Sequence, residues 1–420
     1  MRVAHLLRKC NAAEWGGTET AVQRLLEGLR AHRVNAVVYC PHIRNNGHHP
    51  DPLAEAGWTV KRFNACLPIL GVPEQRKRQL IAVGGNLMSF DLLPALWREP
   101  DLDVIHTHTL GRLGAIALNV ARRRGLPFVV TIHGGLLDLP TQLKSDLDQL
   151  GNGGWEWGKM FSLLLQTRRF FANADVVITC NEKEANLFSR QYPDKRVMVQ
   201  AHGVPLARYQ QDQRETARQA FPQLHNRDVL LAVGRLDPVK NQSWLIEHAP
   251  PLFKRFPDAA LVLAGPCTDE TYGQLIQQKI DHLGLADRVL LTGGMPPDDP
   301  RLIGLMQEAK ALLLPSISET FGLVILEAWA AGIPVIASRT TGSCALIQHG
   351  RNGWLFSLVH PGEFHDAVSS VLQCPELSRE LAAAGHELVR NHHDSVALAG
   401  RMKRLYEQLM EEKHAVRDSA

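Results

Sequence analysis

The sequence has few cysteines and no long apolar run. Its seven cysteines are scattered, odd in number and without a Cys-x-x-Cys pair, so we expect reduced, mostly buried thiols rather than disulfides or a zinc site. No run reaches the roughly 18 apolar residues that a membrane-spanning helix needs. The start, MRVAHLLRKC, carries charges at Arg2, Arg8 and Lys9 without a long apolar core. We therefore expect no signal peptide and a cytoplasmic location.

A strong excess of one charge is also missing, since 46 Lys and Arg face 43 Asp and Glu. The net charge of +3 is small for 420 residues and does not favour nucleic-acid binding. A mild basic excess is still compatible with an anionic small molecule or an anionic membrane surface. The composition, 45% hydrophobic and 21% charged, is that of a soluble globular protein, and the length predicts two or three domains.

Short runs rich in Val, Ile and Leu alternate with amphipathic stretches along the whole chain. The expected strands are residues 2–7, 35–40, 103–108, 127–134 and 175–180 in the first half, and 228–235, 259–266, 288–293, 311–316 and 333–338 in the second. Such near-continuous apolar strands, separated by helices, are typical of parallel sheets covered on both faces. The predicted fold class is therefore α/β, with two doubly wound domains.

The alternation breaks near residues 200–225, where Gly, Pro and polar residues gather. We predict a first domain over residues 1–205 and a second over 206–393. Residues 394–420 form an amphipathic pattern, expected to be a last helix that packs back on the first domain. Because ligands of such sheets bind outside the carboxyl ends of the strands, site residues should directly follow strands.

Two glycines, Gly16 and Gly17, follow the first expected strand. Without side chains they let the backbone approach a ligand, and a helix from about Thr18 would point free N–H groups at that spot, which favours an anion. The alternative is a plain strand-to-helix turn capped by Thr18.

The loop GRLDPVKNQ follows the strand at 228–235 and contains Gly234, Arg235 and Lys240. Two cations at a strand end and a helix start would suit a diphosphate. The alternative is a solvated basic turn. Asp237 is expected to order this loop rather than to take part in chemistry.

The stretch SISETFGLVILEAWAAG places Glu319 and Glu327 among apolar residues. Ser318 or Thr320 could cap a helix that begins near Phe321, with Glu319 at its N-terminus. Carboxylates accept paired hydrogen bonds from vicinal hydroxyls, so each acid could hold a sugar ring. The alternative is that Glu319 is only a helix-start acid and that Glu327 pairs with a basic side chain.

Histidines and tryptophans mark the ends of strands in the first half. His106 and His108 end the strand at 103–108, and His133 follows the next one. A histidine there can donate to a sugar hydroxyl or to a departing oxygen, although strand-end histidines are often structural; His133 is the best candidate. Trp155 and Trp157 follow the loop GNGG and could stack on an acceptor sugar as a lid, or pack beneath the loop.

Residues 74–100 are basic first and apolar later. This run could touch a membrane surface. Gly84 and Gly85 interrupt a long amphipathic helix, so membrane association is not favoured.

Taken in order, these motifs resemble the retaining nucleotide-sugar glycosyltransferases of the GT-B, glycogen-synthase-like group, in particular glycosyltransferase family 4. The resemblance spans nearly the whole chain and rests on GG before a helix, DVIHTH, TIHGG, ADVVIT, GRLDPVKN, the E-x7-E element SETFGLVILEAWAAG, and HGRNGWLF. It implies two Rossmann-like domains facing across a cleft. It also implies hexosyl transfer from a nucleotide-diphosphate sugar to a hydroxyl acceptor by same-face attack, with no cofactor and no metal.

The resemblance also implies roles for individual residues. Arg235 and Lys240 would clamp the diphosphate, Glu319 would bind donor-sugar hydroxyls, and Glu327 would take the ribose hydroxyls. His133 would contact the donor sugar near the reacting carbon. The implied backbone contacts to the donor are Gly16, Gly17, Gly234, Phe321, Gly322, Leu323 and Val324.

Some features depart from the family pattern or favour other readings. After the expected strand at 259–266, the family usually has G-x-G-x, whereas this chain has GPCTDETYG. In the later segment TTGSCALI, Ala345 stands at a position where the family frequently has an acid. The pairs Asp101/Asp103 and Asp146/Asp148 are interpreted as surface acids rather than metal ligands. A nucleotide-sugar epimerase and a catalytically silent sugar-nucleotide-binding partner subunit remain alternatives, whereas no GxGxxG follows a strand to support a dehydrogenase. The motifs leave the nucleotide, the sugar, the acceptor and the oligomeric state open.

Overall fold

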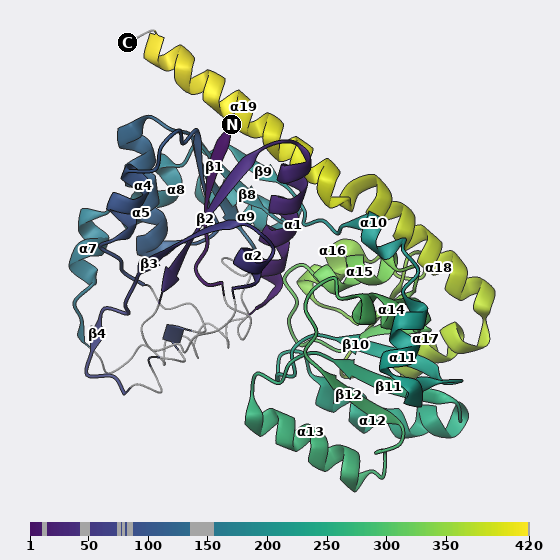
Figure 1. Cartoon of the computed structure of the whole chain (residues 1–420). Helices are drawn as coiled ribbons and strands as arrows, with labels where there is room; N and C mark the ends of the chain where they lie inside the picture. Colours follow the sequence, from purple (N-terminus) through teal and green to yellow (C-terminus); the bar gives the residue numbers. More distant parts are fainter. Residues whose placement is uncertain are drawn as a thin grey trace. The chain divides into compact units, whose positions relative to one another are not determined.

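The computed structural model describes residues 1–10, 15–42, 51–73, 77, 80–81, 87–134 and 155–418. They fall into two compact units (Figure 1). Unit 1 comprises Met1–Ala201 and Val396–Ala420, and unit 2 comprises His202–Ser395. Among the described residues, no helix combines the length and the apolar character needed to cross a bilayer.

Unit 1 is built on a seven-stranded parallel sheet with the order β3-β2-β1-β5-β6-β8-β9. Its strands are β1 (Arg2–Leu6), β2 (Asn35–His42), β3 (Thr59–Asn64), β5 (Val104–Thr107), β6 (Phe128–Ile132), β8 (Val176–Thr179) and β9 (Val197–Val199). The sequence analysis missed β3 and β9. Both are edge strands, and the exposed polar residues of β3 and the shortness of β9 hide the apolar signal of a buried strand.

Both faces of this sheet are covered, which explains its continuous apolar strands. Ala4 and Leu6 of β1 belong to one core with Leu113 of α5. Val3, on the opposite face, belongs to a second core with Leu405 of α19. The helices of unit 1 are α1 (Gly17–Ala31), α2 (Pro52–Glu55), α4 (Leu92–Trp97), α5 (Gly111–Arg124), α7 (Lys159–Leu164), α8 (Phe170–Asn173), α9 (Glu182–Gln191) and α19 (Ser395–Asp418), with a 3-10 helix at Thr167–Arg169.

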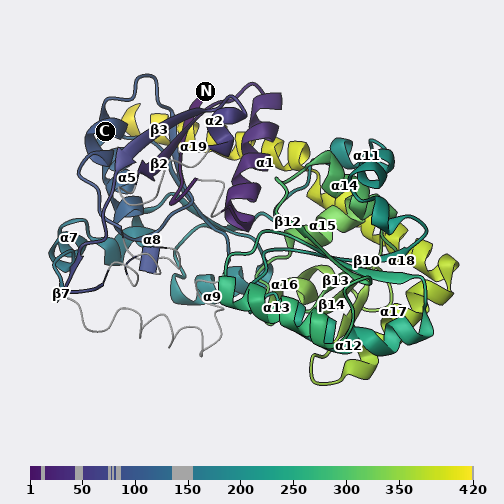
Figure 2. The same cartoon turned by 60° about the horizontal axis from the view of Figure 1, so that its bottom comes forward.

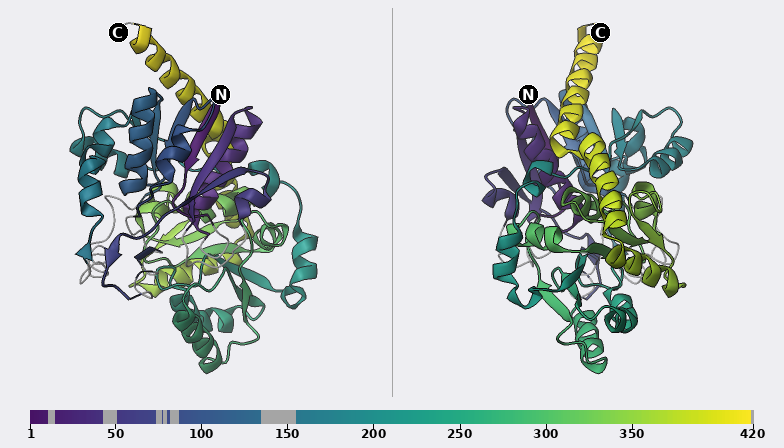
Figure 3. Two further views of the ribbon diagram at one scale, coloured as in Figure 1. Left: turned by 60° about the vertical axis from the view of Figure 1, so that its left-hand side comes forward. Right: turned by 90° about the vertical axis from the view of Figure 1, so that its right-hand side faces the viewer.

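The last helix, α19, packs on the sheet of unit 1 although it lies far away in the sequence (Figure 3). Its buried residues are Ala399, Met402, Leu405, Tyr406 and Leu409. Tyr406 is fully buried, and its hydroxyl lies 2.6 Å from Nδ1 of His106 on β5. Thr131 on β6 lies 2.6 Å from the other ring nitrogen, so both nitrogens of His106 are bound.

Replacing Tyr406 by phenylalanine should destabilise unit 1 by about 1–3 kcal/mol, because Nδ1 of buried His106 would lose its partner. Urea unfolding of wild type and variant measures the difference. Tyr192→Phe is the matched control. That tyrosine stacks on Phe188, and its hydroxyl has no hydrogen bond among the described residues, so its loss should cost less than about 0.5 kcal/mol. Equal effects of the two variants would contradict the anchoring role of Tyr406.

Unit 2 contains a six-stranded parallel sheet with the order β12-β11-β10-β13-β14-β15. Four of these strands, β10, β12, β13 and β14, are labelled in Figure 2. Its strands are β10 (Asp228–Val233), β11 (Ala259–Ala264), β12 (Val289–Gly293), β13 (Ala311–Leu314), β14 (Val335–Ser338) and β15 (Trp354–Phe356). Five of them were expected; β15, a three-residue edge strand, was missed. The α/β class and the two parallel sheets predicted from the sequence are confirmed.

Helices separate the strands of unit 2 as the alternating pattern predicts. They are α10 (Leu206–Tyr209), α11 (Arg214–Ala220), α12 (Gln242–Arg255), α13 (Glu270–His282), α14 (Pro300–Glu308), α15 (Leu323–Ala330), α16 (Thr341–Leu346), α17 (Pro361–Gln373) and α18 (Pro375–Leu388), with a 3-10 helix at Pro222–Leu224 and a π-helix at Val389–His393. Helix α15 is buried over most of its surface, because seven of its residues lie in the interior: Val324, Ile325, Leu326, Glu327, Ala328, Trp329 and Ala330.

Each sheet has one point where the chain reverses the direction in which it adds strands. In unit 1 this point lies between β1 and β5, and in unit 2 between β10 and β13. Open α/β sheets bind ligands outside the carboxyl ends of the strands at such switch points. The loops that follow these four strands are therefore the places to look for a site.

Candidate functional site

The loops after β10 and β13 meet in unit 2. The amide of Ile317 donates to the carbonyl oxygen of Val239 at 2.8 Å. The side-chain amide of Asn241 donates to the carbonyl oxygen of Pro315 at 3.2 Å. Because β10 and β13 are neighbours in the sheet, their carboxyl ends bring together segments that are far apart in the sequence.

An ion pair joins these two loops. Nζ of Lys240 lies 2.5 Å from Oε2 of Glu319, and the two side chains are 23% and 15% exposed. A charge-assisted hydrogen bond of this kind fixes both groups while leaving part of each accessible. Gly234 lies one residue beyond β10, and its amide donates to the carbonyl oxygen of Ala264.

Arg235 lies in the same loop and is 45% exposed. Its guanidinium pairs with Asp237 at 3.0 Å. The other carboxylate oxygen of Asp237 accepts from the amides of Val239 and Lys240, each at 3.0 Å. Asp237 therefore orders the loop, as the sequence analysis expected, and holds the backbone of Lys240 in place.

The predicted helix start in the glutamate motif is wrong. Helix α15 begins at Leu323 with Gly322 as its N-cap, and neither Ser318 nor Thr320 caps it. Gly322 adopts a φ of +87°, a left-handed conformation that favours glycine. Glu319 thus precedes the helix instead of starting it, and its ionic partner is Lys240.

The residues between Glu319 and Gly322 are held by their surroundings. Phe321 is only 4% exposed. Its ring packs edge-on against the ring of His202, and the two ring centroids lie 4.7 Å apart. Leu323 and Val324 open the helix, and Glu327 lies one turn further on, 8% exposed. The amide of Gly342, in α16, donates to the carbonyl oxygen of Glu319 at 2.7 Å. This contact fixes the backbone that carries the glutamate.

Gly342 was not identified from the sequence, because its importance lies in a contact between distant segments. A Cβ at this position would lie 2.6 Å from the amide nitrogen of Phe321 and 2.8 Å from the carbonyl oxygen of Glu319. A similar close approach occurs at Gly265, where a Cβ would lie 2.0 Å from the carbonyl oxygen of Gly234. Only glycine lets these backbones come so close.

Gly342→Ala should displace the Glu319–Phe321 backbone and destabilise unit 2 by about 1–3 kcal/mol, because an extra methyl group in a packed region forces a shift. Urea unfolding provides the measurement. Gly362→Ala is the control, since a Cβ there meets no atom within 4 Å. If both alanine variants were equally stable, the close approach would have no energetic consequence.

In unit 1, helix α1 begins at Gly17 with Gly16 as the N-cap, close to the expected start near Thr18, and the alternative of a turn capped by Thr18 is wrong. The amide of Gly16 donates to Oε2 of Glu19 at 2.9 Å. Glu19 is buried, and desolvation raises the pKa of its carboxyl. The side chain of Glu19 therefore occupies part of the helix N-terminus that the sequence suggested for an anion.

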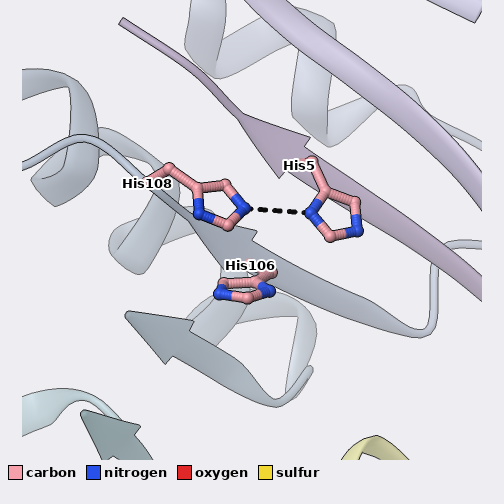
Figure 4. Close-up of side chains that lie close together, drawn as sticks. All are labelled: His5, His106 and His108. Carbon is pink, nitrogen blue, oxygen red and sulfur yellow. Dashed lines mark hydrogen bonds between the residues drawn. The ribbon is translucent and has the colours of Figure 1, made fainter. Parts of the chain in front are cut away.

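Four histidines gather beside the switch point of unit 1. Nε2 of His133 lies 2.9 Å from Nδ1 of His108, and Nε2 of His108 lies 3.1 Å from Nδ1 of His5. The ring of His106 lies 4.2 Å from that of His108, and Figure 4 shows it beside the pair His5 and His108. His5 was missed because only strand register, which pairs it with His106 across β1 and β5, reveals its neighbours.

Burial keeps three of these histidines, His5, His106 and His133, uncharged at neutral pH. Desolvation lowers the pKa of His5 to about 3 and that of His133 to about 4, and it also lowers the pKa of His106. Neutral imidazoles each donate from one nitrogen and accept at the other. The three imidazoles are therefore neutral groups, each able to donate and to accept, near the carboxyl ends of β1, β5 and β6.

The two tryptophans considered for the acceptor lie in a short strand and in the turn that follows it. Trp155 is in a short strand, β7 (Trp155–Glu156), which pairs antiparallel with β4 (Ile69–Leu70). Trp157 is half-buried and packs edge-on against Phe161, with the two ring centroids 5.9 Å apart. The loop GNGG, Gly84, Gly85, Asp146 and Asp148 lie outside the described residues.

The first of the two DxD patterns has a structural role. A carboxylate oxygen of Asp103 accepts from the amide of Arg2 at 2.7 Å, next to β1. Asp101 adopts a φ of +51° in the turn before β5. The sequence analysis interpreted both residues as surface acids; Asp101 is exposed, whereas Asp103 is partly buried.

Comparison with known proteins supports the architecture. Residues 16–203 match the model of the glycosyl transferase 4-like domain, and residues 213–388 match that of the glycosyl transferases group 1. The D-inositol 3-phosphate glycosyltransferase of Frankia alni is 31% identical over 380 residues, which are 88% of each chain.

Two solved structures are similar over nearly their full lengths. The Anabaena protein HepE in complex with UDP has a TM-score of 0.71 at 19% identity, covering 97% of this chain and 100% of that one. Sucrose-phosphate synthase from Thermosynechococcus elongatus has a TM-score of 0.71 at 21% identity, covering 98% and 99%. With both halves matched and two parallel-sheet units of this kind, the chain belongs to the group 1 glycosyltransferases and has the GT-B fold.

Proposed function

We propose that this chain is a retaining hexosyltransferase that moves a sugar from a nucleotide-diphosphate sugar to a hydroxyl acceptor without a metal ion. The observation that carries the proposal is the Lys240–Glu319 pair at the switch point of unit 2, with Arg235 in the same loop. In this proposal unit 2 binds the donor and unit 1 contributes the acceptor side.

The chemistry requires stabilisation of a departing diphosphate as it gains charge. Arg235 and Lys240 supply two cations at the carboxyl end of β10, and Glu319 offers a carboxylate to sugar hydroxyls next to them. Preorganised cations of this kind perform the role that a metal has in other phosphate sites. The acceptor attacks from the same face, and the departing phosphate helps to take its proton.

The names of similar proteins narrow the substrates to test first. Solved structures of the Anabaena protein HepE hold UDP and UDP-glucose. Several relatives are named D-inositol 3-phosphate glycosyltransferases. We therefore propose a UDP-sugar as the donor and a polyol phosphate or a sugar as the acceptor.

Thermal unfolding with UDP, GDP, ADP and their sugar conjugates tests the donor site. A ligand at a hundredfold its dissociation constant adds about 2.7 kcal/mol to stability, which gives a clear shift. One nucleotide should shift the wild type and shift Lys240→Met much less. If no nucleotide shifted the wild type, the donor proposal would fail.

The stereochemistry and the metal requirement have separate tests. The anomeric configuration of the product, read by NMR, should equal that of the donor, and an inverted product would refute retention. Transfer should persist in EDTA, since the cations come from Arg235 and Lys240. Activity that needs added Mg²⁺ or Mn²⁺ would count against the proposed roles.

A further inference from the structure

The loops after β10 and β13 carry equal numbers of positive and negative side chains. The loop GRLDPVKN after β10 contains Arg235, Asp237 and Lys240. In the loop PSISETFG after β13, Glu319 is the only charged residue. Each cation is paired with one acid, Arg235 with Asp237 at 3.0 Å and Lys240 with Glu319 at 2.5 Å. The two loops together therefore have no net charge.

This neutrality is unexpected in a place that is proposed to hold a diphosphate. Glu319 has a proposed role on the substrate, because its carboxylate can bind sugar hydroxyls. Asp237 has no such role. A carboxylate beside Arg235 repels phosphate oxygens and so opposes the attraction that the guanidinium exerts. The charge of Asp237 therefore weakens the site that Arg235 is proposed to form.

The loop does not need this charge for its order. Oδ1 of Asp237 accepts from the amides of Val239 and Lys240, each at 3.0 Å, and the oxygen of an asparagine could accept the same two bonds. Oδ2 faces the guanidinium of Arg235 instead. The backbone of Arg235 is held separately, because Nε2 of Gln242 donates to its carbonyl oxygen at 2.8 Å. One oxygen of Asp237 thus orders the loop, and the other offsets a cation.

The two partners of this ion pair differ in their exposure. The side chain of Asp237 is only 12% exposed, whereas that of Arg235 is 45% exposed. The carboxylate is therefore fixed in the loop, while the guanidinium has room to turn toward a phosphate. A ligand that recruits Arg235 competes with Asp237, and the fixed carboxylate repels each ligand in proportion to the charge of that ligand.

We infer that Asp237 is a specificity-determining residue, which makes the site favour an intact nucleotide-diphosphate sugar over the free nucleoside diphosphate. This inference rests on the proposed function. The diphosphate of a nucleotide sugar carries about two negative charges. The free nucleoside diphosphate carries about one more at pH 8, because the second pKa of a terminal phosphate is about 6. The carboxylate of Asp237 therefore repels the product more than the substrate, which helps the product to leave.

Calorimetric titration of the whole protein with UDP and with UDP-glucose, at pH 8, tests this inference in Asp237→Asn. The substitution removes the charge and keeps an oxygen for the two amides. We expect the affinity for UDP to rise about 30-fold and that for UDP-glucose about 10-fold, so that the preference for the sugar conjugate falls about threefold. A purely structural role predicts the opposite sign, because a disordered loop would bind both ligands more weakly.

A second charge-free variant and a matched control accompany this titration. In Asp237→Ser the hydroxyl can also accept from amides two and three residues further on, so this variant tests the charge if the asparagine variant does not fold. Asp228→Asn removes the same charge from the first residue of β10, at the opposite edge of the sheet, where Asp228 pairs with Lys310. The control should change both affinities less than about twofold, because salt screens distant exposed charges.

The possible failures can be told apart. Equal or weaker binding of UDP by the folded charge-free variants would overturn the role of Asp237 and leave the donor site standing. An equal rise in affinity for UDP and UDP-glucose would overturn the discrimination between them. A wild type that binds neither ligand would refute the donor proposal itself, and the inference with it.

Discussion

Replacing Lys240 by methionine should lower kcat/KM by about 10²–10³-fold, the usual effect of removing one group that stabilises a developing anion. The side chain of Lys240 is only 23% exposed and its Nζ lies 2.5 Å from Oε2 of Glu319, so the structure holds the ammonium in one place. Methionine keeps much of the apolar chain but removes the charge. The remaining carboxylate of Glu319 would then repel the diphosphate, which adds to the loss.

Steady-state kinetics measures the loss in kcat/KM, and calorimetric titration with the nucleoside diphosphate measures the loss in binding affinity. Lys310→Met is the control, because Lys310 pairs with Asp228 at the opposite, amino-terminal edge of the sheet. That variant should stay within about twofold of the wild type. If Lys240→Met bound the diphosphate as tightly as the wild type, Lys240 would not be a diphosphate-binding residue.

The ion pair makes a further, non-additive prediction. Glu319→Gln alone should reduce transfer strongly but should spare or strengthen diphosphate binding, because Lys240 loses its competing carboxylate. The double variant Lys240→Met/Glu319→Gln should bind the diphosphate more tightly than Lys240→Met, since no unpaired carboxylate remains. A double-mutant cycle with strictly additive effects would contradict this coupling.

Mild acid should unfold unit 1, because three histidines, of which His5 and His106 are fully buried, are held neutral there. The pKa of His5 is lowered to about 3 and that of His133 to about 4, and that of His106 is also lowered, in each case chiefly by desolvation. In the unfolded chain these groups titrate near 6.5 and bind protons that the folded unit does not. Stability is therefore complete above about pH 6.5 and falls as the pH decreases toward 4.

The loss of folding stability that we expect for unit 1 in mild acid is large for a single domain. Each histidine can contribute up to about 1.4 kcal/mol per pH unit, so the three together approach about 4 kcal/mol per unit against a usual total of about 5–15 kcal/mol. Amide hydrogen exchange of peptides covering β1 and β5, at pH 7.5 and 5.5, follows unit 1 specifically. His5→Asn should reduce the pH dependence by about one proton. Protection factors in β1, that is, exchange rates divided into the intrinsic rates at each pH, that are as high at pH 5.5 as at pH 7.5 would refute the prediction.

Much of the fold follows from local patterns. Ten expected strands occur in the structure within a few residues of their predicted bounds, because strands buried on both faces must be apolar along their whole length. Strands β3, β9 and β15 were missed, because β3 carries exposed polar residues and β9 and β15 are only three residues long. The start of α15 was wrong because a glycine in the left-handed conformation, and not a polar cap, begins that helix.

By itself, then, the sequence determined the α/β class, the two sheets, the family and the loops in which a site should lie. Only the tertiary structure decided which residues meet. Lys240 and Glu319 are 79 positions apart, and His5 and His108 are 103 apart. These pairs form because the order of strands places β10 beside β13 and β1 beside β5. Strand order depends on packing over the whole sheet, and no local pattern of residues encodes it.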